Sequence, residues 1–218
     1  MSALAATRLL LMRHGETAWN QDARIQGHTD IELNATGHWQ AGRLAAAVAE
    51  DPPDLLYCSD LKRARSTAEP LAARLRLALQ PDPALRERCF GTFEGQRFVD
   101  IEARDPESAR RWRQRDLDFQ PIGGESLREF HARAVAAIEA LCHRHAGRHI
   151  AVVSHGGVLD CLYRAATQTA LDAPRHWAIH NACINRLRHG EQGFSLVVWG
   201  ADQHLSGRPA TDEIGPVA

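Results

Sequence analysis

Three short apolar runs constrain the fold of this chain more than any other feature of its sequence. They cover residues 9–12, 55–58 and 150–153, and polar residues follow each run directly. Continuous apolar runs of about four to eight residues are typical of parallel strands that are covered on both faces. Helical patterns lie between the runs. This alternation predicts an α/β fold with three layers, α/β/α, around a mostly parallel central sheet.

Apolar residues at helical spacing predict the covering helices. The pattern occurs at about 41–48, 61–75 and 127–141. The third helix is expected to begin with a capping box, formed by Ser126 and Glu129. Each helix is expected to bury its apolar face against the sheet.

The sequence predicts a single domain over residues 1–218. Segments 183–188 and 194–199 flank the turn-rich sequence HGEQG, which predicts a hairpin or two edge strands. The arginine-rich segment at about 96–124 is expected to form a helical excursion beside the core. From about residue 201, glycine and proline predict a loosely held tail.

Composition excludes several classes of partner. The formal net charge is -1 and the isoelectric point is near 6.9, so no overall basic field favours nucleic acid or a membrane surface. No apolar run approaches the roughly 18 residues of a membrane span. The N-terminal stretch lacks the basic region of a signal peptide and is interpreted as the first strand. Five scattered cysteines without a CxxC pair are expected to be reduced and mostly buried, which indicates a cytoplasmic protein.

Polar side chains follow all three predicted strands at their carboxyl ends. Arg13 and His14 follow the first run, Ser59 follows the second, and Ser154 and His155 follow the third. Ligands of such sheets bind beyond the carboxyl ends of the strands. The sequence therefore predicts a ligand site at this edge.

The residue types at this edge suit phosphoryl chemistry. Arginine guanidinium groups such as those of Arg13 and Arg63 match the oxygens of a phosphoryl group and neutralise its charge. A histidine can act as a covalent nucleophile, and the carboxyl group of Glu87 can protonate a leaving oxygen. Glycines after His155 allow the backbone to approach an anion. Because the cations are protein groups, this chemistry is expected to need no metal.

The motifs of the chain, taken in order, resemble those of one family. RHGETxWN, RxQGxxD, SDLxRAxxTA, LxExxxGxxEG, GGES and SHGG occur between residue 9 and about residue 199. This order is similar to the histidine phosphatase superfamily, the phosphoglycerate mutase-like proteins. The resemblance implies a phosphoglycerate mutase-like fold for nearly the whole chain.

The resemblance also implies roles for individual residues. His14 would be the nucleophile that becomes phosphohistidine, and Glu87 the general acid and then the base. Some relatives carry an acid directly after the second histidine, whereas this chain has glycines there. The phosphoryl group would be held by Arg13, Arg63 and His155, with Asn20 against it. The pocket would be completed by Gln26, Gly27, Ser59, Arg88 and Gly156.

Two reactions remain open within the family. Hydrolysis of a small phosphorylated metabolite is favoured, because mutase relatives tend to have FxGW and AHGN where this chain has RIQGHTD and SHGG. No cofactor is expected for this hydrolysis. The alternative is a phosphoglycerate mutase, which would depend on 2,3-bisphosphoglycerate. Glu87-Arg88 is similar to the ERxYG element of mutases, so Arg88 either binds an acidic substrate or faces solvent. A non-catalytic module that binds phosphorylated ligands should have lost the nucleophile or the acid, and this chain has both.

Other features have more ordinary interpretations. His143, His145 and His149, with Cys142, are interpreted as the end of a helix rather than a metal site. The cluster Arg110, Arg111, Arg113 and Arg115 is either a solvated helix face or a means of attracting an anionic substrate. Trp112 and Phe119 are expected to be packing residues, with a lid role left open. The sequence leaves the oligomeric state open, a homodimer included.

Overall fold

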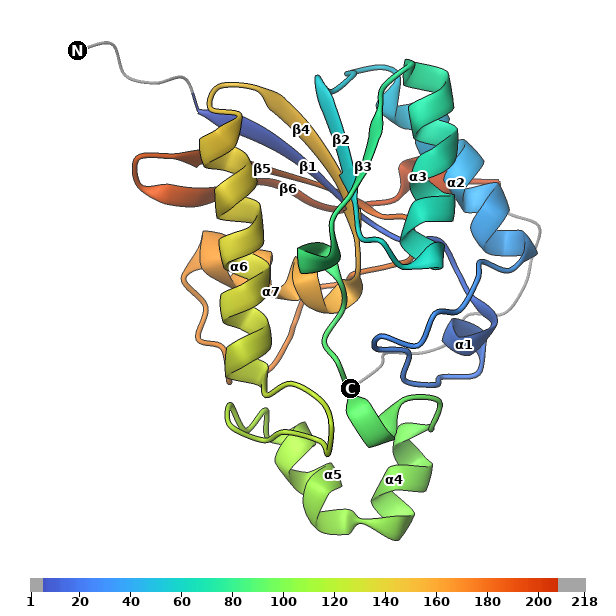
Figure 1. Cartoon of the computed structure of the whole chain (residues 1–218), viewed down its shortest axis with the longest axis vertical. Coiled ribbons are helices and arrows are strands. Elements are labelled where there is room, and N and C mark those ends of the chain that lie inside the picture. The colour runs from blue at the N-terminus through green and yellow to red at the C-terminus, as the bar shows by residue number, and fades with distance from the viewer. Residues whose placement is uncertain (1–5, 208–218) are drawn as a thin grey trace.

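The six-stranded sheet at the centre of the molecule has the order β3-β2-β4-β1-β5-β6 (Figure 1). A computed structural model describes residues 6–207 of the chain. The strands are β1 (Thr7–Arg13), β2 (Leu55–Cys58), β3 (Leu79–Pro81), β4 (His149–Ser154), β5 (Ile184–Gly190) and β6 (Gly193–Ala201). Strands β1 to β4 pair in parallel, and β5 runs antiparallel to both of its neighbours. The predicted mostly parallel sheet is confirmed.

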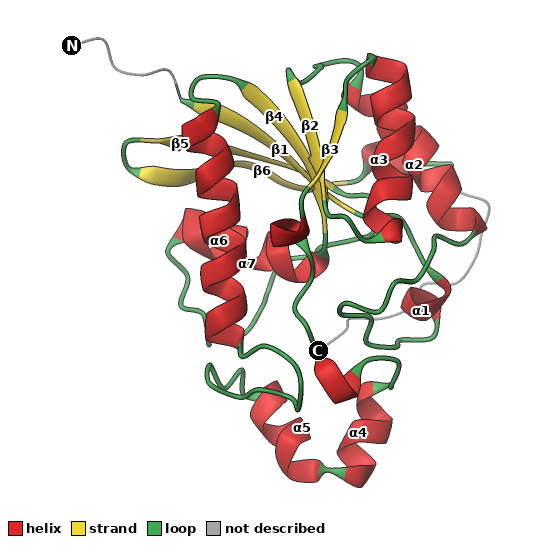
Figure 2. Cartoon of the chain, viewed as in Figure 1, coloured by secondary structure: helices red, strands yellow, loops and turns green. Residues whose placement is uncertain are grey.

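Helices cover both faces of the sheet and form the outer two layers (Figure 2). On one face lie α2 (Ala35–Val48) and α3 (Lys62–Leu75), and on the other lie α6 (Leu127–Arg144) and α7 (Gly156–Thr167). An apolar core lies on each face of the sheet, and alternate residues of β1 pack into one core or the other. Leu9 packs toward α6 and α7, whereas Leu10 packs toward α2 and α3. Burial on both faces explains why the strands read as continuous apolar runs.

The predicted start of the third helix is confirmed. Ser126 Oγ accepts a hydrogen bond from the backbone N–H of Glu129, and the Glu129 carboxylate accepts from the backbone N–H of Ser126. A second capping box, which the sequence analysis did not identify, opens the short α1 (Ala18–Gln21) with Thr17 and Asn20. Such reciprocal bonds satisfy N–H groups that have no partner inside a helix.

The segment between β3 and α6 leaves the sheet and forms a lobe below it (Figure 1). After η1 (Pro83–Leu85), which packs against α6, the lobe contains η2 (Gly91–Phe93), α4 (Phe98–Arg104) and α5 (Pro106–Arg113). A small apolar core holds this lobe together, and the Trp112 ring stacks on Phe90 with centroids 4.9 Å apart. Phe119 is buried in the same core. The packing role predicted for Trp112 and Phe119 is therefore confirmed.

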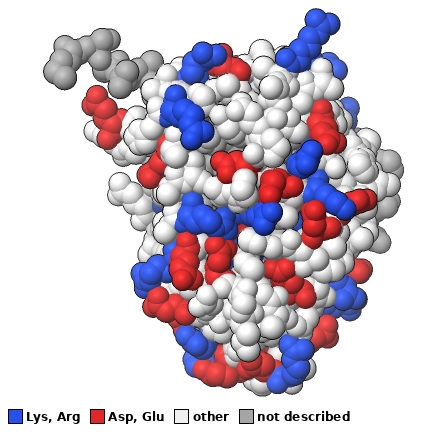
Figure 3. Space-filling model, viewed as in Figure 1, with Lys and Arg blue, Asp and Glu red and all other residues white. Residues whose placement is uncertain are grey.

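The arginine cluster of this lobe is neutralised by carboxylates. Its members form ion pairs as follows: Arg110 with Glu107, Arg111 with Asp116, Arg113 with Glu102, and Arg115 with Asp160. In the space-filling view, acidic and basic side chains alternate over the end of the molecule that carries α4 and α5 (Figure 3). Paired charges of this kind exert little field on a distant anion. The cluster therefore gives little support to substrate steering.

The C-terminal hairpin is confirmed, but two related predictions are wrong. Of the two hairpin strands, β6 lies at an edge of the sheet but β5 does not, because β5 also pairs with β1. The loose tail does not begin at residue 201, since η3 (Gln203–Leu205) packs on α2 and Arg43 Nε donates to the His204 carbonyl at 2.7 Å. Residues 208–218 of the predicted tail lie outside the described residues.

The cysteines agree with the sequence prediction in their burial. All five are free thiols, and only Cys89 is not buried. Among the helices of residues 6–207, none has the length and apolar character needed to cross a membrane.

Candidate active site

His14 is fixed at the carboxyl end of β1 by backbone hydrogen bonds on both sides. Its N–H donates to the carbonyl of Ser154, at the end of β4, over 2.9 Å. The next N–H, of Gly15, donates to Thr67 Oγ1 on α3 over 2.9 Å. A Cβ at Gly15 would lie 2.6 Å from the carbonyl oxygen of Gly37, so only glycine fits between β1 and α2. The imidazole therefore has a rigid support.

The hydrogen bond of the His14 ring determines which nitrogen is free to react. Nδ1 lies 2.7 Å from the Gly15 carbonyl oxygen, which can only accept, so Nδ1 carries the proton. Nε2 then keeps its lone pair. Burial of the ring lowers the pKa of His14 well below 6.5, and the charges of Arg63 and Arg13 lower it further. The ring is thus a neutral imidazole with Nε2 available as a nucleophile.

His155 faces His14 from the end of β4. The two ring centroids are 5.2 Å apart and the ring planes are inclined by 58°. His155 is fully buried, yet neither of its ring nitrogens has a hydrogen-bond partner among the described residues. Its pKa is also lowered well below 6.5, first by burial and then by Arg63. Buried polar atoms are normally paired, so His155 is suited to bind a ligand.

Arg13 and Arg63 flank the two imidazoles, and protein carbonyls orient both guanidinium groups. Arg13 Nη1 donates to the Ile179 carbonyl over 2.6 Å. Arg63 donates from Nη1 to the Thr29 carbonyl and from Nη2 to the Gly27 carbonyl, over 3.0 and 2.7 Å. The Nε atom of each arginine is buried and has no partner among the described residues. Burial also lowers the pKa of Arg63 to about 10.

Glu87 reaches the same region from the loop that follows β3. Its Oε2 accepts from the backbone N–H of Gly157, in the first turn of α7, over 3.0 Å, and its Oε1 accepts from the N–H of Arg88. A Cβ at Gly157 would lie only 2.1 Å from Oε1, so this glycine leaves the space that the carboxylate occupies. The acid is thus placed beside the residues that follow His155.

The remaining predicted pocket residues surround this group. Asn20 Oδ1 accepts from the Thr17 N–H over 3.1 Å, and Gln26 Oε1 lies 3.1 Å from Thr17 Oγ1. Ser59 is buried after β2, where its N–H donates to the Val153 carbonyl. These residues therefore shape the loops around the two histidines.

Gly27 and Gly156 lie directly beside the two arginines. The Gly27 carbonyl accepts from Arg63, and a Cβ at Gly156 would lie 3.5 Å from Arg13 Nε. Gly27 has a φ of +54°, and a Cβ there would lie 2.1 Å from Glu94 Oε1. Gly27 is thus required by its backbone conformation and by this close approach.

Arg88 does not face solvent, so that interpretation is wrong. It is 8% exposed, and it donates from Nε to the Glu125 carbonyl and from Nη2 to the Phe119 carbonyl, over 2.9 and 2.8 Å. Its guanidinium also lies over the Phe90 and Trp112 rings. Burial lowers the pKa of Arg88 to about 10. Through these contacts Arg88 holds residues 119–125 against the loop that carries Glu87.

Two residues that the sequence analysis missed hold the loops of the site. Glu94 accepts from the backbone N–H groups of His28, Thr29 and Phe90, which joins the 26–30 loop to η2. Its signal was present, because Glu94 is the last acid of the LxExxxGxxEG motif. Arg133, on α6, donates to the carbonyl of Glu87 over 3.0 Å and pairs with Glu125. Nothing in the local pattern distinguishes Arg133 from a solvent-facing arginine on a helix.

Of the three histidines assigned to a helix end, His143 and His145 lie at the end of α6, whereas His149 begins β4, and each makes different contacts. His143 packs against the His189 ring, His145 Nε2 lies 2.8 Å from the Tyr57 hydroxyl, and His149 Nδ1 lies 3.0 Å from Arg8 Nη2. Among residues 6–207, no three His, Cys, Asp or Glu side chains are grouped as a metal site would require.

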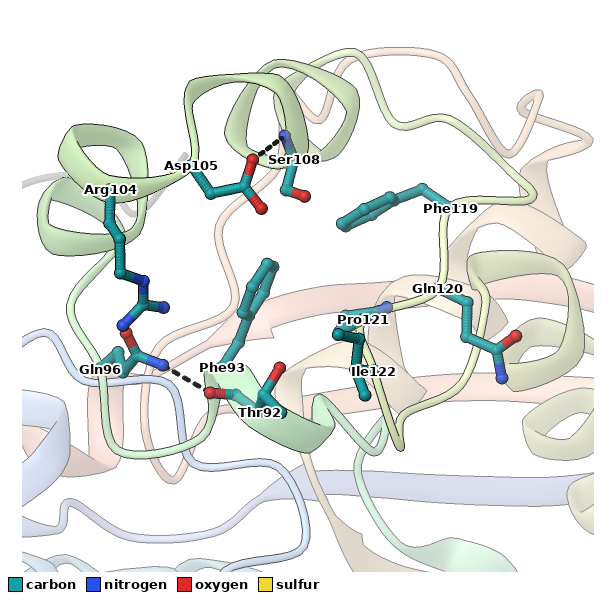
Figure 4. Close-up of a pocket in the computed structure, with 10 residues that line it drawn as sticks. All are labelled: Thr92, Phe93, Gln96, Arg104, Asp105, Ser108, Phe119, Gln120, Pro121 and Ile122. Atoms are coloured by element: carbon teal, nitrogen blue, oxygen red, sulfur yellow. Dashed lines mark hydrogen bonds between the residues drawn. The ribbon is translucent and has the colours of Figure 1, made fainter.

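A cavity of about 400 Å³ lies inside the lobe, apart from the two histidines (Figure 4). The Phe93 and Phe119 rings point into it, and Ile122 lies at its border. Asp105, which also lines it, accepts from the Ser108 N–H and so caps α5. None of the residues predicted for catalysis or phosphate binding lines this cavity.

Comparisons with known proteins identify the family of the chain. The sequence model of the histidine phosphatase superfamily (branch 1) matches residues 9–202. Phosphoglycerate mutase-like protein 4 of Arabidopsis thaliana is 37% identical over 90% of this chain and 86% of its own. The metal-independent phosphoserine phosphatase of the same plant is 36% identical, over 92% and 84%.

Solved structures of related proteins share the fold of this chain. The solved structure of Bacillus stearothermophilus YhfR superposes with a TM-score of 0.85 at 30% identity, and covers 92% of this chain and 100% of its own. With the motifs, the fold and the relatives in agreement, the chain belongs to the histidine phosphatase superfamily.

Proposed function

We propose that the chain hydrolyses small phosphomonoesters through a phosphohistidine intermediate on His14. One observation carries the proposal. The Nε atoms of Arg13 and Arg63 and both ring nitrogens of His155 are buried without partners beside an imidazole whose Nε2 is free. Leaving such groups unpaired costs about 1–3 kcal/mol each. The oxygens of a phosphoryl group are strong acceptors, so they would satisfy the Nε–H groups of both arginines and the one N–H of the neutral His155 ring.

The first half of the reaction transfers the phosphoryl group to the protein. Arg13, Arg63 and His155 donate hydrogen bonds to the phosphoryl oxygens, and the two guanidinium charges neutralise the charge that develops on them. The lone pair of His14 Nε2 attacks phosphorus as the bond to the ester oxygen breaks. Glu87, in its protonated form, gives its proton to that oxygen, and the alcohol leaves.

The second half returns the enzyme to its starting state. The Glu87 carboxylate takes a proton from water as the water oxygen attacks phosphorus, and the bond to His14 Nε2 breaks. The products are inorganic phosphate, a neutral imidazole and a protonated Glu87. Every positive charge in this scheme belongs to the protein. Full activity after dialysis against a chelator is therefore expected, and loss of activity that a metal ion restores would contradict this part of the proposal.

Phosphoglycerate mutation is the second candidate. The relative named phosphoglycerate mutase-like protein 4 favours it, whereas the relative named metal-independent phosphoserine phosphatase favours hydrolysis. The contacts of Arg88 support hydrolysis, because two of its guanidinium nitrogens already donate to backbone carbonyls rather than toward a substrate carboxylate.

A direct comparison of products separates the two candidates. The chain is incubated with 3-phosphoglycerate, with and without 2,3-bisphosphoglycerate, and both inorganic phosphate and 2-phosphoglycerate are measured. Hydrolysis predicts phosphate release that does not depend on the bisphosphate. Conversion to 2-phosphoglycerate with negligible phosphate release would establish the mutase instead. A panel of phosphoserine, sugar phosphates and nucleoside monophosphates then identifies the preferred leaving group.

A further inference from the structure

A second cavity with arginine side chains lies at the other end of β1. It has a volume of about 300 Å³ and is lined by Arg8, Asp51, His149, Arg186 and Arg188, among others. Arg8 is the second residue of β1, and His14 directly follows its last. By the rise of a strand the two places are about 20 Å apart. The cavity is thus separate from the site around His14.

The register of the sheet places these arginines on one face. Arg8 on β1 is the direct antiparallel partner of Arg188 on β5, and Arg186 is the partner of Leu10. Alternate strand residues share a face, and Leu10 belongs to the core beneath α2 and α3. On the other side of β1, the Cα partner of Arg8 is His149 of β4. Like charges directly opposite each other on neighbouring strands are destabilising, so this arrangement has a cost that the fold alone does not explain.

Among the described residues, Asp51 is the one carboxylate that lines this cavity. Its pKa is lowered mainly by the hydrogen bonds from Arg8, and the nearby charge of Arg186 contributes. Arg8 Nη2 donates to both oxygens of Asp51, over 2.6 and 2.7 Å. Within residues 6–207, Arg186 and Arg188 donate no side-chain hydrogen bond and form no ion pair. Burial, and then the charge of Arg8, lowers the pKa of His149, so its imidazole is neutral near pH 7. Two guanidinium charges therefore remain uncompensated within one cavity.

We propose that this cavity binds a phosphate group, either inorganic phosphate or the phosphoryl end of a small metabolite. Guanidinium forks donate pairs of hydrogen bonds to phosphoryl oxygens, and two of them on one strand can hold the same group. An anion placed between Arg186 and Arg188 also reduces the repulsion between these two guanidinium groups of β5. A cavity of about 300 Å³ is at the small end of ligand sites. The proposal does not depend on the reaction at His14.

The test uses NMR of the isotope-labelled full chain during a titration with inorganic phosphate. Leu9 and Leu187 are among the residues that line the cavity, so their amide signals report on it. We expect these signals to shift and saturate as for one site, and to do so equally in Arg63→Ala, where phosphate binding beside His14 is weakened. In Arg186→Gln/Arg188→Gln we expect binding at these signals to weaken by at least about tenfold.

Two controls make the result specific. Arg74→Gln removes an exposed arginine of α3 that does not line the cavity, and it should leave the titration unchanged. Chloride at the same ionic strength should give no saturating shift. The proposal is overturned if the shifts do not saturate, if chloride reproduces them, or if they persist in the double variant. Thermal melting of that variant verifies that it is folded.

The source of the phosphate is decided in a second arm. The His14→Ala variant, which cannot consume a phosphomonoester by the proposed route, is titrated with inorganic phosphate and with 3-phosphoglycerate. If inorganic phosphate binds more tightly at Leu9 and Leu187, the site is one for the released product. If the ester binds more tightly, the site is one for a metabolite. If neither shifts these signals, the proposal is contradicted.

Discussion

The substitution Gly157→Ala should separate the role of Glu87 in the reaction from its role in the fold. A Cβ at this position lies 2.1 Å from Glu87 Oε1, and separations under 3.0 Å are essentially never seen for real Cβ atoms. The carboxylate must therefore shift by about 0.9 Å or more, and its bond to the Gly157 N–H is strained or lost. The backbone itself tolerates alanine, because Gly157 is not among the residues with positive φ.

The size of the effect follows from what the shift does to proton transfer. Misplacing a reacting group by about 1 Å costs on the order of 100-fold in rate, and losing a general acid altogether costs about 100- to 10,000-fold. We therefore expect kcat to fall about 100-fold on an alkyl phosphate, or about 2.7 kcal/mol in the barrier. The loss should be smaller on p-nitrophenyl phosphate, because its leaving group is weakly basic and needs the proton less.

The assay compares kcat on the two substrates for Gly157→Ala and for its neighbour Gly156→Ala. At Gly156 the nearest atom to a new Cβ is Arg13 Nε at 3.5 Å, an ordinary contact, so this variant should lose far less activity. The Phe130 ring lies 2.9 Å from the Cβ at Gly157, so melting temperatures must show that the variant is folded under assay conditions. If kcat on the alkyl phosphate stays within about threefold of the parent, or falls equally on both substrates, Glu87 is not the acid.

Three further predictions follow from the same contacts. Arg63→Lys removes a fork that carbonyls hold in place, and kcat/KM should fall at least about 100-fold; a loss under about threefold would mean that this arginine does not hold the phosphoryl group. Arg133→Met releases the loop that carries Glu87 and should lower both kcat and the free energy of unfolding, the latter by about 2–4 kcal/mol. The control Arg128→Met, on the same helix, should change the free energy of unfolding by no more than about 0.5 kcal/mol. Equal losses of stability in the two variants would contradict the special role of Arg133. Burial lowers the pKa of His14 and His155, so below about pH 6.5 the unfolded chain binds protons that the folded chain does not. Urea unfolding should therefore show a free energy of unfolding that is highest above that pH and falls by up to about 1.4 kcal/mol per pH unit per histidine below it. A rise in stability toward acid would contradict the buried neutral imidazoles.

Sequence patterns predicted the elements whose burial produces a recognisable run or spacing of apolar residues. Strands β1, β2 and β4 are covered on both faces, so they read as uninterrupted apolar runs. Strand β3 was missed, because it is three residues long and none of them is fully buried. The residues after β6 were read as a loose tail, since their contacts with α2 lie far away in the sequence.

The residues of the candidate site also divide into those that sequence patterns identified and those that they did not. The motifs placed His14 and His155 at strand ends and Arg63 in the first turn of a helix, and the fold brings the three together, although their chemical roles remain predictions. Arg88 was misread because an arginine that donates to backbone carbonyls and stacks on aromatic rings looks, in a sequence, like any exposed arginine. Arg133 was missed because its partner, the Glu87 carbonyl, is 46 positions away. Residues that hold a site from a distance leave no spacing signal.

The most direct test of the account is to trap the intermediate. The chain is mixed with a phosphomonoester, quenched during turnover under alkaline conditions that preserve phosphohistidine, digested, and analysed by mass spectrometry. We predict one phosphoryl group on the peptide that contains His14, attached to that histidine and absent from the His14→Ala variant. A phosphoryl group on any other residue, or turnover with no covalent intermediate in Gly157→Ala or in the parent chain, would contradict the proposed mechanism.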